Sequence, residues 1–140
     1  MQSWFITGAS RGFGLRVARL ALAEGHNVVA TARRESAVVE ELGAHPNLLA
    51  LSLDVTDEEQ ARAAAAAAVE RFGRIDVLLN NAGFGLLGAV EEATAEEVER
   101  VYRTNVFGLL GVTRAVLPYM RARRAGRMRT TPRDLLRSVR

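Results

Sequence analysis

The sequence contains no cysteine and no lysine, and only two histidines, His26 and His45. Without cysteine the chain has no disulfide, no thiolate nucleophile and no cysteine-ligated zinc, and two histidines alone do not make a persuasive metal site. We therefore expect no metal. All 19 basic residues are arginines, so a reaction that depends on a lysine ammonium cannot find one in these 140 residues.

Long hydrophobic runs are also missing. No stretch reaches the roughly 18 apolar residues of a membrane-spanning helix, and residues 1–4 lack the basic segment and apolar core of a secretory signal. We predict a cytoplasmic protein with no membrane partner. At 140 residues, of which 49% are hydrophobic and 25% charged, the chain has the size and composition of one globular domain.

The excess positive charge lies at the C-terminal end of the sequence. Residues 1–125 carry a net charge of −1, whereas residues 126–140 carry +4. The basic character therefore describes a short tail and not the whole domain. Because this tail has no aromatic side chain on which a base could stack, we predict no nucleic-acid partner.

Short apolar segments alternate with helical patterns along the chain. Two Thr-x-x-Glu capping boxes, Thr56 with Glu59 and Thr94 with Glu97, mark helix starts. Continuously apolar strands between helices are typical of a parallel sheet covered on both faces, so we predict a doubly wound α/β fold. The predicted strands are 3–7, 27–31, 48–53 and 76–79, and the predicted helices are 13–24, 35–42, 57–72, a segment from 94, and about 106–124.

Two glycine-rich loops are candidates for a phosphate-binding turn. Such a turn binds phosphate through the free N–H groups and the positive dipole end of a helix N-terminus. Residues 83–88 (GFGLLG) match the G-x-G-x-x-G pattern letter for letter but do not lead directly into a helix. Residues 7–14 (TGASRGFG) join a strand directly to an amphipathic helix, within a βαβ unit of about 30 residues. We favour this second loop; the alternative is an ordinary βα turn with three glycines.

Three further motifs follow this loop in order: Asp54-Val55, NNAG at residues 80–83, and Asn105 in TNVFG. Together the four motifs resemble the short-chain dehydrogenase/reductase family, in which they are the cofactor loop, the adenine-contacting pair, the motif after the fourth strand and the active-site asparagine. The resemblance covers about residues 1–127. It implies a Rossmann-type dinucleotide-binding topology and hydride transfer between a nicotinamide cofactor and a small-molecule carbonyl or secondary alcohol. Taken singly, each motif has a structural alternative: a loop carboxylate, a turn and an ordinary helix residue.

The end of the second strand predicts which nicotinamide cofactor is bound. An acidic residue there accepts the ribose 2′-hydroxyl of NAD, whereas a basic residue holds the 2′-phosphate of NADP. Arg33 and Arg34 stand at this place without an acid, and Arg11 in the glycine loop adds a third cation. We predict NADP over NAD; the alternative is that both arginines only solvate the next helix. The predicted cofactor-binding residues are Gly8, Arg11, Gly12, Gly14, Arg33, Asp54, Asn81, Ala82 and Gly83.

The catalytic groups that the resemblance implies are only partly present. In that family a tyrosine and a lysine form a Y-x-x-x-K arrangement, because a phenol with a pKa of about 10 needs a nearby cation to act at neutral pH. A serine on the preceding strand completes the set, but Ser138 is the only serine here beyond residue 52. Tyr119 and Arg123 have the spacing but precede the family's fifth strand. Asn105 is the only catalytic position that transfers, and we predict that these 140 residues alone are inactive.

The C-terminal residues depart from the resemblance. An apolar strand is expected after residue 128, but the sequence continues as RTTPRDLLRSVR. We predict a fold truncated after its fifth helix, with a Rossmann-type NADP-binding domain at 1–127 and a basic tail outside the family at 128–140. The strand at 76–79 would then be an open apolar edge, and this edge and the last helix would promote self-association and low solubility.

Two alternatives stay open at this stage. In the first, the tail is a partner-binding segment, since Thr131, Pro132 and Asp134 suit the start of a short helix. The whole chain is, alternatively, a non-catalytic NADP-binding module or regulator.

Overall fold

A computed structural model describes residues 1–131, in which strands and helices alternate along the chain. Two short elements differ from α-helix: Val90–Glu92 (η1) is a 3-10 turn and Arg103–Gly108 (η2) is a π-helix. In order, the elements are β1 (Ser3–Thr7), α1 (Gly12–Ala23), β2 (Asn27–Ala32), α2 (Glu35–Leu42), β3 (Leu48–Ser52), α3 (Glu58–Phe72), β4 (Val77–Asn80), η1 (Val90–Glu92), α4 (Ala95–Tyr102), η2 (Arg103–Gly108), α5 (Leu109–Ala122) and β5 (Arg127–Thr130).

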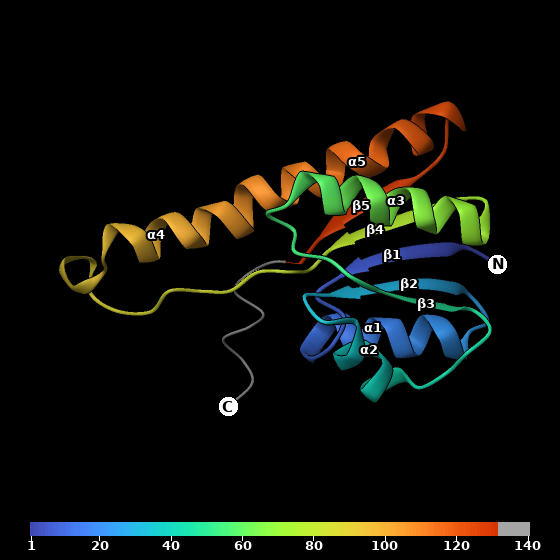
Figure 1. The fold of residues 1–140 in the computed structure, drawn as a ribbon, viewed down its shortest axis with the longest axis horizontal. Coiled ribbons are helices and arrows are strands. Elements are labelled where there is room, and N and C mark those ends of the chain that lie inside the picture. Colours follow the sequence, from blue (N-terminus) through green and yellow to red (C-terminus); the bar gives the residue numbers. More distant parts are fainter. Residues whose placement is uncertain (132–140) are drawn as a thin grey trace.

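The five strands form one parallel sheet in the order β3-β2-β1-β4-β5 (Figure 1). The chain builds outward from β1 to β3 and then returns to place β4 on the other side of β1. In the centre, Phe5 is in register with Val29 on one side and Leu78 on the other. The predicted doubly wound α/β fold is confirmed, and the return of the chain creates a topological switch point between β1 and β4, where such sheets bind ligands.

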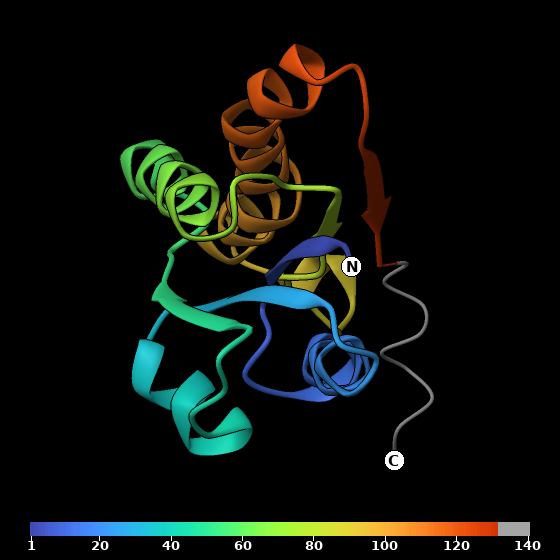
Figure 2. The ribbon, with the colours of Figure 1, turned by 90° about the vertical axis from the view of Figure 1, so that its right-hand side faces the viewer.

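Helices cover both faces of the sheet, with α1 and α2 on one side and α3 and α5 on the other (Figure 2). Successive residues of β1 point to opposite faces, so Phe5 belongs to the core under α3 and α5, and Ile6 to the core under α1 and α2. Four alanines of α3 are buried in the first core, and their small size lets this helix lie close to the sheet.

The two predicted capping boxes have different outcomes. The box at Thr94 is confirmed: its hydroxyl accepts from the Glu97 N–H (3.2 Å), and the Glu97 carboxylate accepts from the Thr94 N–H (2.9 Å). These bonds from Thr94 hold the pKa of Glu97 below its ordinary value. The box at Thr56 is wrong, because Asp57 caps α3 by accepting from the Gln60 N–H at 3.1 Å. The Thr56 hydroxyl instead donates to Asp54.

The prediction of an open edge at residues 76–79 is also wrong, because β5 covers β4. The Arg127 N–H donates to the Asp76 carbonyl (2.8 Å), and the Thr131 N–H donates to the Asn80 carbonyl (3.1 Å). Residues 128–130, which the sequence analysis assigned to the tail, therefore continue the sheet beyond the fifth helix. Backbone hydrogen bonds and not burial hold this strand, and so its composition did not reveal it. Pro132, Asp134 and Ser138 lie outside the described residues.

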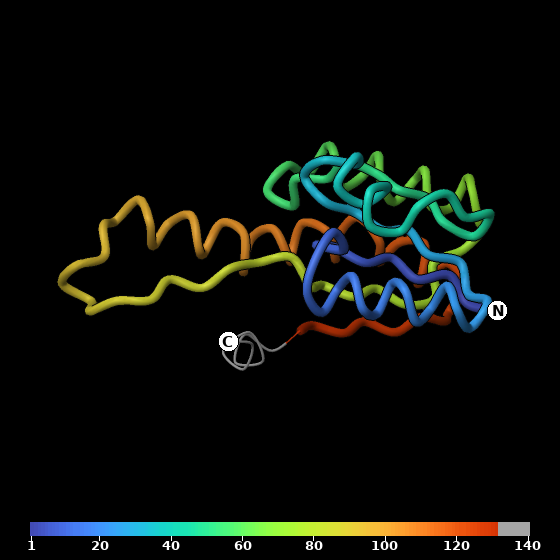
Figure 3. The backbone as a smooth tube through the Cα atoms, turned by 90° about the horizontal axis from the view of Figure 1, so that it is seen from below, coloured from blue at the N-terminus to red at the C-terminus, as the bar shows by residue number. Residues whose placement is uncertain are grey.

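The helices α4, η2 and α5 follow one another without a break and form a long helix that projects past the carboxyl edge of the sheet (Figures 1 and 3). Residues 84–106, including the loop that leads into this helix, are called the arm. Its surface carries exposed apolar side chains such as Leu87 and Val90, which are 83% and 93% exposed. Within residues 1–131, no helix is both long and apolar enough to cross a bilayer, and the cytoplasmic location stays a prediction.

Candidate cofactor-binding site

The N-terminus of α1 presents unsatisfied backbone donors at the switch point. The first helical bond is made by the Leu15 N–H, which donates to the Arg11 carbonyl at 3.3 Å. The three preceding N–H groups, from Gly12 to Gly14, have no acceptor among the described residues. The first turn also contains no acidic residue, and Arg11 provides no side-chain cap. This is the arrangement in which a helix N-terminus binds a phosphate.

Glycine is required where this turn meets the loop after β4. Gly8 has a φ of +65°, and a Cβ added there would lie 2.9 Å from the Ala82 Cα. A Cβ on Gly14 would lie 2.5 Å from the Gly8 carbonyl oxygen and would also meet the Asn81 side chain. The two loops are therefore packed backbone to backbone, with no space for a larger residue.

Hydrogen bonds lock the same two loops together. The Thr7 hydroxyl, at the end of β1, accepts from the backbone N–H groups of Asn81 and Ala82, both at 3.0 Å. The Asn81 side chain donates to the Gly8 carbonyl (2.9 Å) and accepts from the Thr131 hydroxyl (3.0 Å). Asn81, predicted as a cofactor contact, thus ties the glycine turn to the residue that follows β5. Thr7 was not predicted from the sequence, and Thr131 was considered there only as the start of a short helix, whereas its backbone N–H and hydroxyl bond to Asn80 and Asn81. A polar residue ending an apolar strand was the available signal for Thr7.

Three arginines face solvent around this edge of the sheet. Arg11 precedes α1, while Arg33 and Arg34 follow β2, and all three side chains are exposed. None of them pairs with a carboxylate within residues 1–131, although seven other ion pairs form there. The backbone N–H of the neighbouring Glu35 donates to the Ser52 hydroxyl (3.0 Å). These guanidinium groups are thus available to an anionic ligand.

Asp54 lies between β3 and α3, at the same edge of the sheet. Its Oδ1 accepts from the Thr56 N–H (2.9 Å) and the Thr56 hydroxyl (2.7 Å). Its own N–H donates to Gln60. The carboxylate therefore shapes this loop, which was the structural alternative for this residue, and its adenine contact stays a prediction.

Asn105 lies in the π-helix η2 and holds the loop after β4. Its side-chain amide accepts from the Phe84 N–H (3.1 Å) and donates to the Phe84 carbonyl (2.7 Å), in the manner of a neighbouring strand. A single π-turn inside an α-helix often marks a functional position. The geometry shows Asn105 positioning the loop that begins at Gly83, and its catalytic role stays a prediction.

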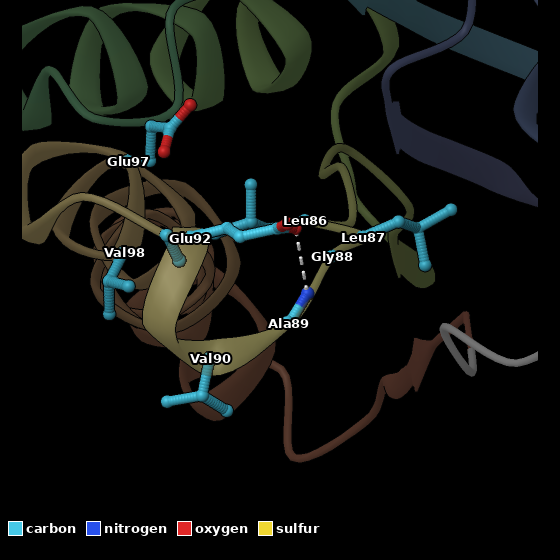
Figure 4. A pocket seen from close by; sticks show the side chains of 9 residues that line it. Leu86, Leu87, Gly88, Ala89, Val90, Glu92, Glu97 and Val98 are labelled. Atoms are coloured by element: carbon cyan, nitrogen blue, oxygen red, sulfur yellow. Dashed lines mark hydrogen bonds between the residues drawn. The ribbon is translucent and has the colours of Figure 1, made fainter.

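The second glycine-rich segment, residues 83–88, runs along the arm and does not enter a helix directly, as the sequence analysis expected. The segment lines a shallow hollow of about 300 Å³ together with residues of η1 and α4 (Figure 4). Within it the Glu92 carboxylate accepts from the Ala89 N–H at 3.4 Å (Figure 4). This hollow is distinct from the glycine turn at the switch point.

Tyr119 and Arg123 do not belong to this site. Arg123 donates to the Asp76 carboxylate (3.1 Å) at the amino end of β4, on the edge of the sheet opposite the glycine turn. Asp76 also accepts from Arg74 and from the Ser3 N–H (2.8 Å). Burial raises the pKa of Asp76, but these bonds outweigh it and hold the pKa below its ordinary value. The two arginines thus stabilise a buried carboxylate that sequence analysis missed.

The geometry at the switch point agrees with comparison to known proteins. The family model described as short chain dehydrogenase matches residues 2–130. The chain belongs to the short-chain dehydrogenase family. It is 44% identical over 123 residues to a 3-ketodihydrosphingosine reductase of Bacteroides thetaiotaomicron, covering 88% of this chain and 44% of that protein.

Other members of the short-chain dehydrogenase family are similarly related. The NADP-dependent 3-hydroxy acid dehydrogenase YdfG of Salmonella typhi is 41% identical over 125 residues, covering 86% of this chain and 50% of that one. The crystal structure of a short-chain dehydrogenase from Streptomyces avermitilis superposes with a TM-score of 0.86 at 45% identity, covering 92% of this chain and 48% of that one. The chain thus spans about half the length of the relatives it matches.

Membership of the short-chain dehydrogenase family implies a nicotinamide dinucleotide cofactor. The free N–H groups of α1 and the closely packed glycines fit its phosphates, and the arginines after β2 fit a further anionic group. Within residues 1–131, no three His, Cys, Asp or Glu side chains gather in a way that could hold a metal ion. The individual cofactor contacts stay predictions.

Proposed function

We propose that this chain binds NADP at the glycine turn. We further propose that a whole dehydrogenase built on this domain transfers hydride between NADP(H) and a carbonyl or secondary alcohol. The free donors of α1, from Gly12 to Gly14, would hold the pyrophosphate, because a helix N-terminus stabilises negative charge. Ala82 and Gly83 would border the nicotinamide half, on the loop that Asn105 positions. When bound, the cofactor supplies the hydride acceptor or donor.

The preference for NADP is supported chiefly by Arg33 and Arg34. Both are exposed at the end of β2 and have no carboxylate partner in the described part of the chain. An acidic residue at the end of β2 would repel a 2′-phosphate, and arginines occupy this position; the acidic residue that follows them, Glu35, lies in the first turn of α2. A guanidinium binds phosphate through paired N–H donors, so its removal should weaken NADP more than NAD.

Titration of the purified chain with NADPH and NADH tests this preference. We expect Arg33→Ala to weaken NADPH binding by about tenfold and to leave NADH binding nearly unchanged. Arg100→Ala, which removes an exposed arginine of the arm, is the matched control. Equal affinity of the unmodified chain for NADPH and NADH would overturn the proposal.

A non-catalytic NADP-binding module is the second candidate. It is favoured by the placement of Tyr119 and Arg123 at the opposite edge of the sheet and by the lack of lysine in the sequence. We expect these 140 residues to bind NADPH without oxidising it in the presence of carbonyl compounds. Adding the second half of a related dehydrogenase as a separate chain distinguishes the candidates, since only a reductase half would gain activity.

A further inference from the structure

One buried side chain joins the end of β5 to the loop after β4. Thr131 directly follows β5 and is 3% exposed, whereas all four residues of β5 are exposed. Its backbone N–H donates to the Asn80 carbonyl (3.1 Å), and its hydroxyl donates to Oδ1 of Asn81 (3.0 Å). Thr131 is therefore fixed against this loop by its backbone and by its side chain.

The Asn81 amide carries this contact on to the glycine turn. Its Nδ2 donates to the Gly8 carbonyl (2.9 Å). A Cβ added to Gly8 would lie 3.1 Å from the same Nδ2, and a Cβ added to Gly14 would lie closer still. The amide thus touches the turn at both ends, at Gly8 beside β1 and at Gly14 inside α1. The free N–H groups of the first turn of α1 lie within this stretch of chain.

Hydrogen bonds at both ends hold this amide in one orientation. The Gly8 carbonyl only accepts, so it requires the Nδ2 end of the amide, and Oδ1 then points to the Thr131 hydroxyl. An asparagine amide rotates over a broad range when nothing fixes it. Removal of the Thr131 hydroxyl would therefore release the Oδ1 end and let the amide turn away from the Gly8 carbonyl.

The glycine turn needs such contacts from outside to keep its shape. Gly8 and Gly12 have φ values of +65° and +58°, and glycine has more conformational freedom than any other residue. A turn whose N–H groups already point to the phosphate binds it more tightly, because ordering them during binding would lower the affinity. Asn81 supplies one such contact from the loop after β4, and Thr131 anchors it to the end of β5.

We propose that Thr131 is a positioning residue for the dinucleotide, a role that rests on the proposed binding of NADP at this turn. Through Asn81, Thr131 holds the glycine turn in the form that receives the pyrophosphate. NADP and NAD share the pyrophosphate, so Thr131 affects the affinity for both. Arg33, in contrast, affects only the choice between them, because it faces the 2′-phosphate that NAD lacks.

Titration with NADPH and NADH, at a temperature where circular dichroism shows every variant folded, tests this role on the full chain. Thr131→Val keeps the shape of the side chain but removes its donor. We expect it to weaken the binding of both dinucleotides by about fivefold and to leave the ratio of the two affinities unchanged. Thr131→Ser keeps the hydroxyl and should bind both like the unmodified chain.

Variants at other positions separate positioning from stability. Asp76→Asn weakens bonds at the opposite edge of the sheet, so it should destabilise the fold and leave both affinities unchanged. Thr130→Val alters the exposed neighbour and should also bind like the unmodified chain. In the background of Asn81→Ala, Thr131→Val should have no further effect on affinity, because Thr131 acts through Asn81.

The glycine turn can also be observed without cofactor, in the backbone amide NMR spectrum of the chain. Thr131→Val should shift and broaden the N–H signals of Gly12 and Gly14, whereas Thr130→Val should not. If the unmodified chain bound neither dinucleotide, the proposed function would fail, and these signals would still show whether Thr131 holds the turn. Three results would overturn the role of Thr131: unchanged glycine signals, affinities that Thr131→Val leaves as they are, and independent effects of Thr131→Val and Asn81→Ala.

Discussion

Strands β4 and β5 are neighbours in one sheet, yet different forces hold them. All four residues of β4 are buried, and all four residues of β5 are exposed. In β4 the side chains of Leu78 and Leu79 fill the cores on the two faces of the sheet, whereas β5 is held by backbone hydrogen bonds and by polar contacts at its two ends. A strand can thus have the register of a sheet without sharing its core.

Truncation of one side chain in each strand tests this contrast most strongly. Leu78 and Met128 are in register, but Leu78 is fully buried and Met128 is 41% exposed. We expect Leu78→Ala to lower the free energy of unfolding by about 3 kcal/mol, through lost burial and a residual cavity. Met128→Ala should cost less than about 1 kcal/mol. Urea denaturation measures both, and equal losses would mean that β5 shares in the core.

Removal of a tie between the two strands should have the next largest effect. Asp76 immediately precedes β4, and its carboxylate accepts from Arg123, which lies between α5 and β5. We expect Asp76→Asn to cost about 2 kcal/mol at neutral pH, because charge-assisted bonds to two arginines and to the Ser3 N–H are weakened.

The pH dependence follows from the same carboxylate. Because its pKa is lowered on folding, Asp76 stabilises the protein above its unfolded pKa of about 3.9, and this contribution is lost as the pH falls through the folded pKa. Urea titrations at neutral and acidic pH should therefore show a smaller loss of stability in Asp76→Asn than in the unmodified chain. Glu91→Gln, at an exposed carboxylate, serves as control. If Asp76→Asn and the unmodified chain lost the same free energy of unfolding on acidification, this account would be contradicted.

The smallest expected effect lies at the far end of β5. Thr131 is 3% exposed, and its hydroxyl donates to Asn81. Thr131→Val keeps the shape of the side chain but removes this donor, so we expect a loss of about 1 kcal/mol in the free energy of unfolding. Thr130→Val, at the exposed neighbouring position, should change it by less than about 0.5 kcal/mol. Thermal unfolding of the two variants compares them directly, and a larger loss in Thr130→Val would show that the hydrogen bond is not what matters.

The same contrast explains what could be read from the sequence. Strands β1 to β4 were predicted within two residues, because a parallel sheet favours continuously apolar segments; this holds even for β3, which lies at the sheet edge and is only half-buried. The helix at Glu35–Leu42 was predicted with its bounds. The glycine turn was located by its place between a strand and a helix. Burial of a strand selects apolar residues that can be recognised in the sequence, whereas backbone hydrogen bonding selects no particular residue type.

Features built on hydrogen bonds between distant residues escaped prediction. The sequence Arg-Met-Arg-Thr of β5 carries no apolar pattern, and its pairing depends on carbonyl groups about 50 residues earlier. The engagement of Asn81 by Gly8 and Thr131 depends likewise on the assembled sheet. The cap of α3 was mispredicted for a local reason. Thr56 and Asp57 are adjacent and could each cap the helix, but the Thr56 hydroxyl donates to Asp54, so Asp57 accepts from the first turn of α3 instead.

The strand order also constrains how the chain is made. The first strand synthesised, β1, occupies the middle of the sheet, and about 45 residues separate the end of β2 from the start of β4. At about 5–20 residues per second, a ribosome takes roughly 2–9 s to add that length. During this interval one side of β1 has no strand to pair with. Until β4 has been synthesised, the unpaired side of β1 at Phe5 and Ile6 is open to pairing with strands of other chains.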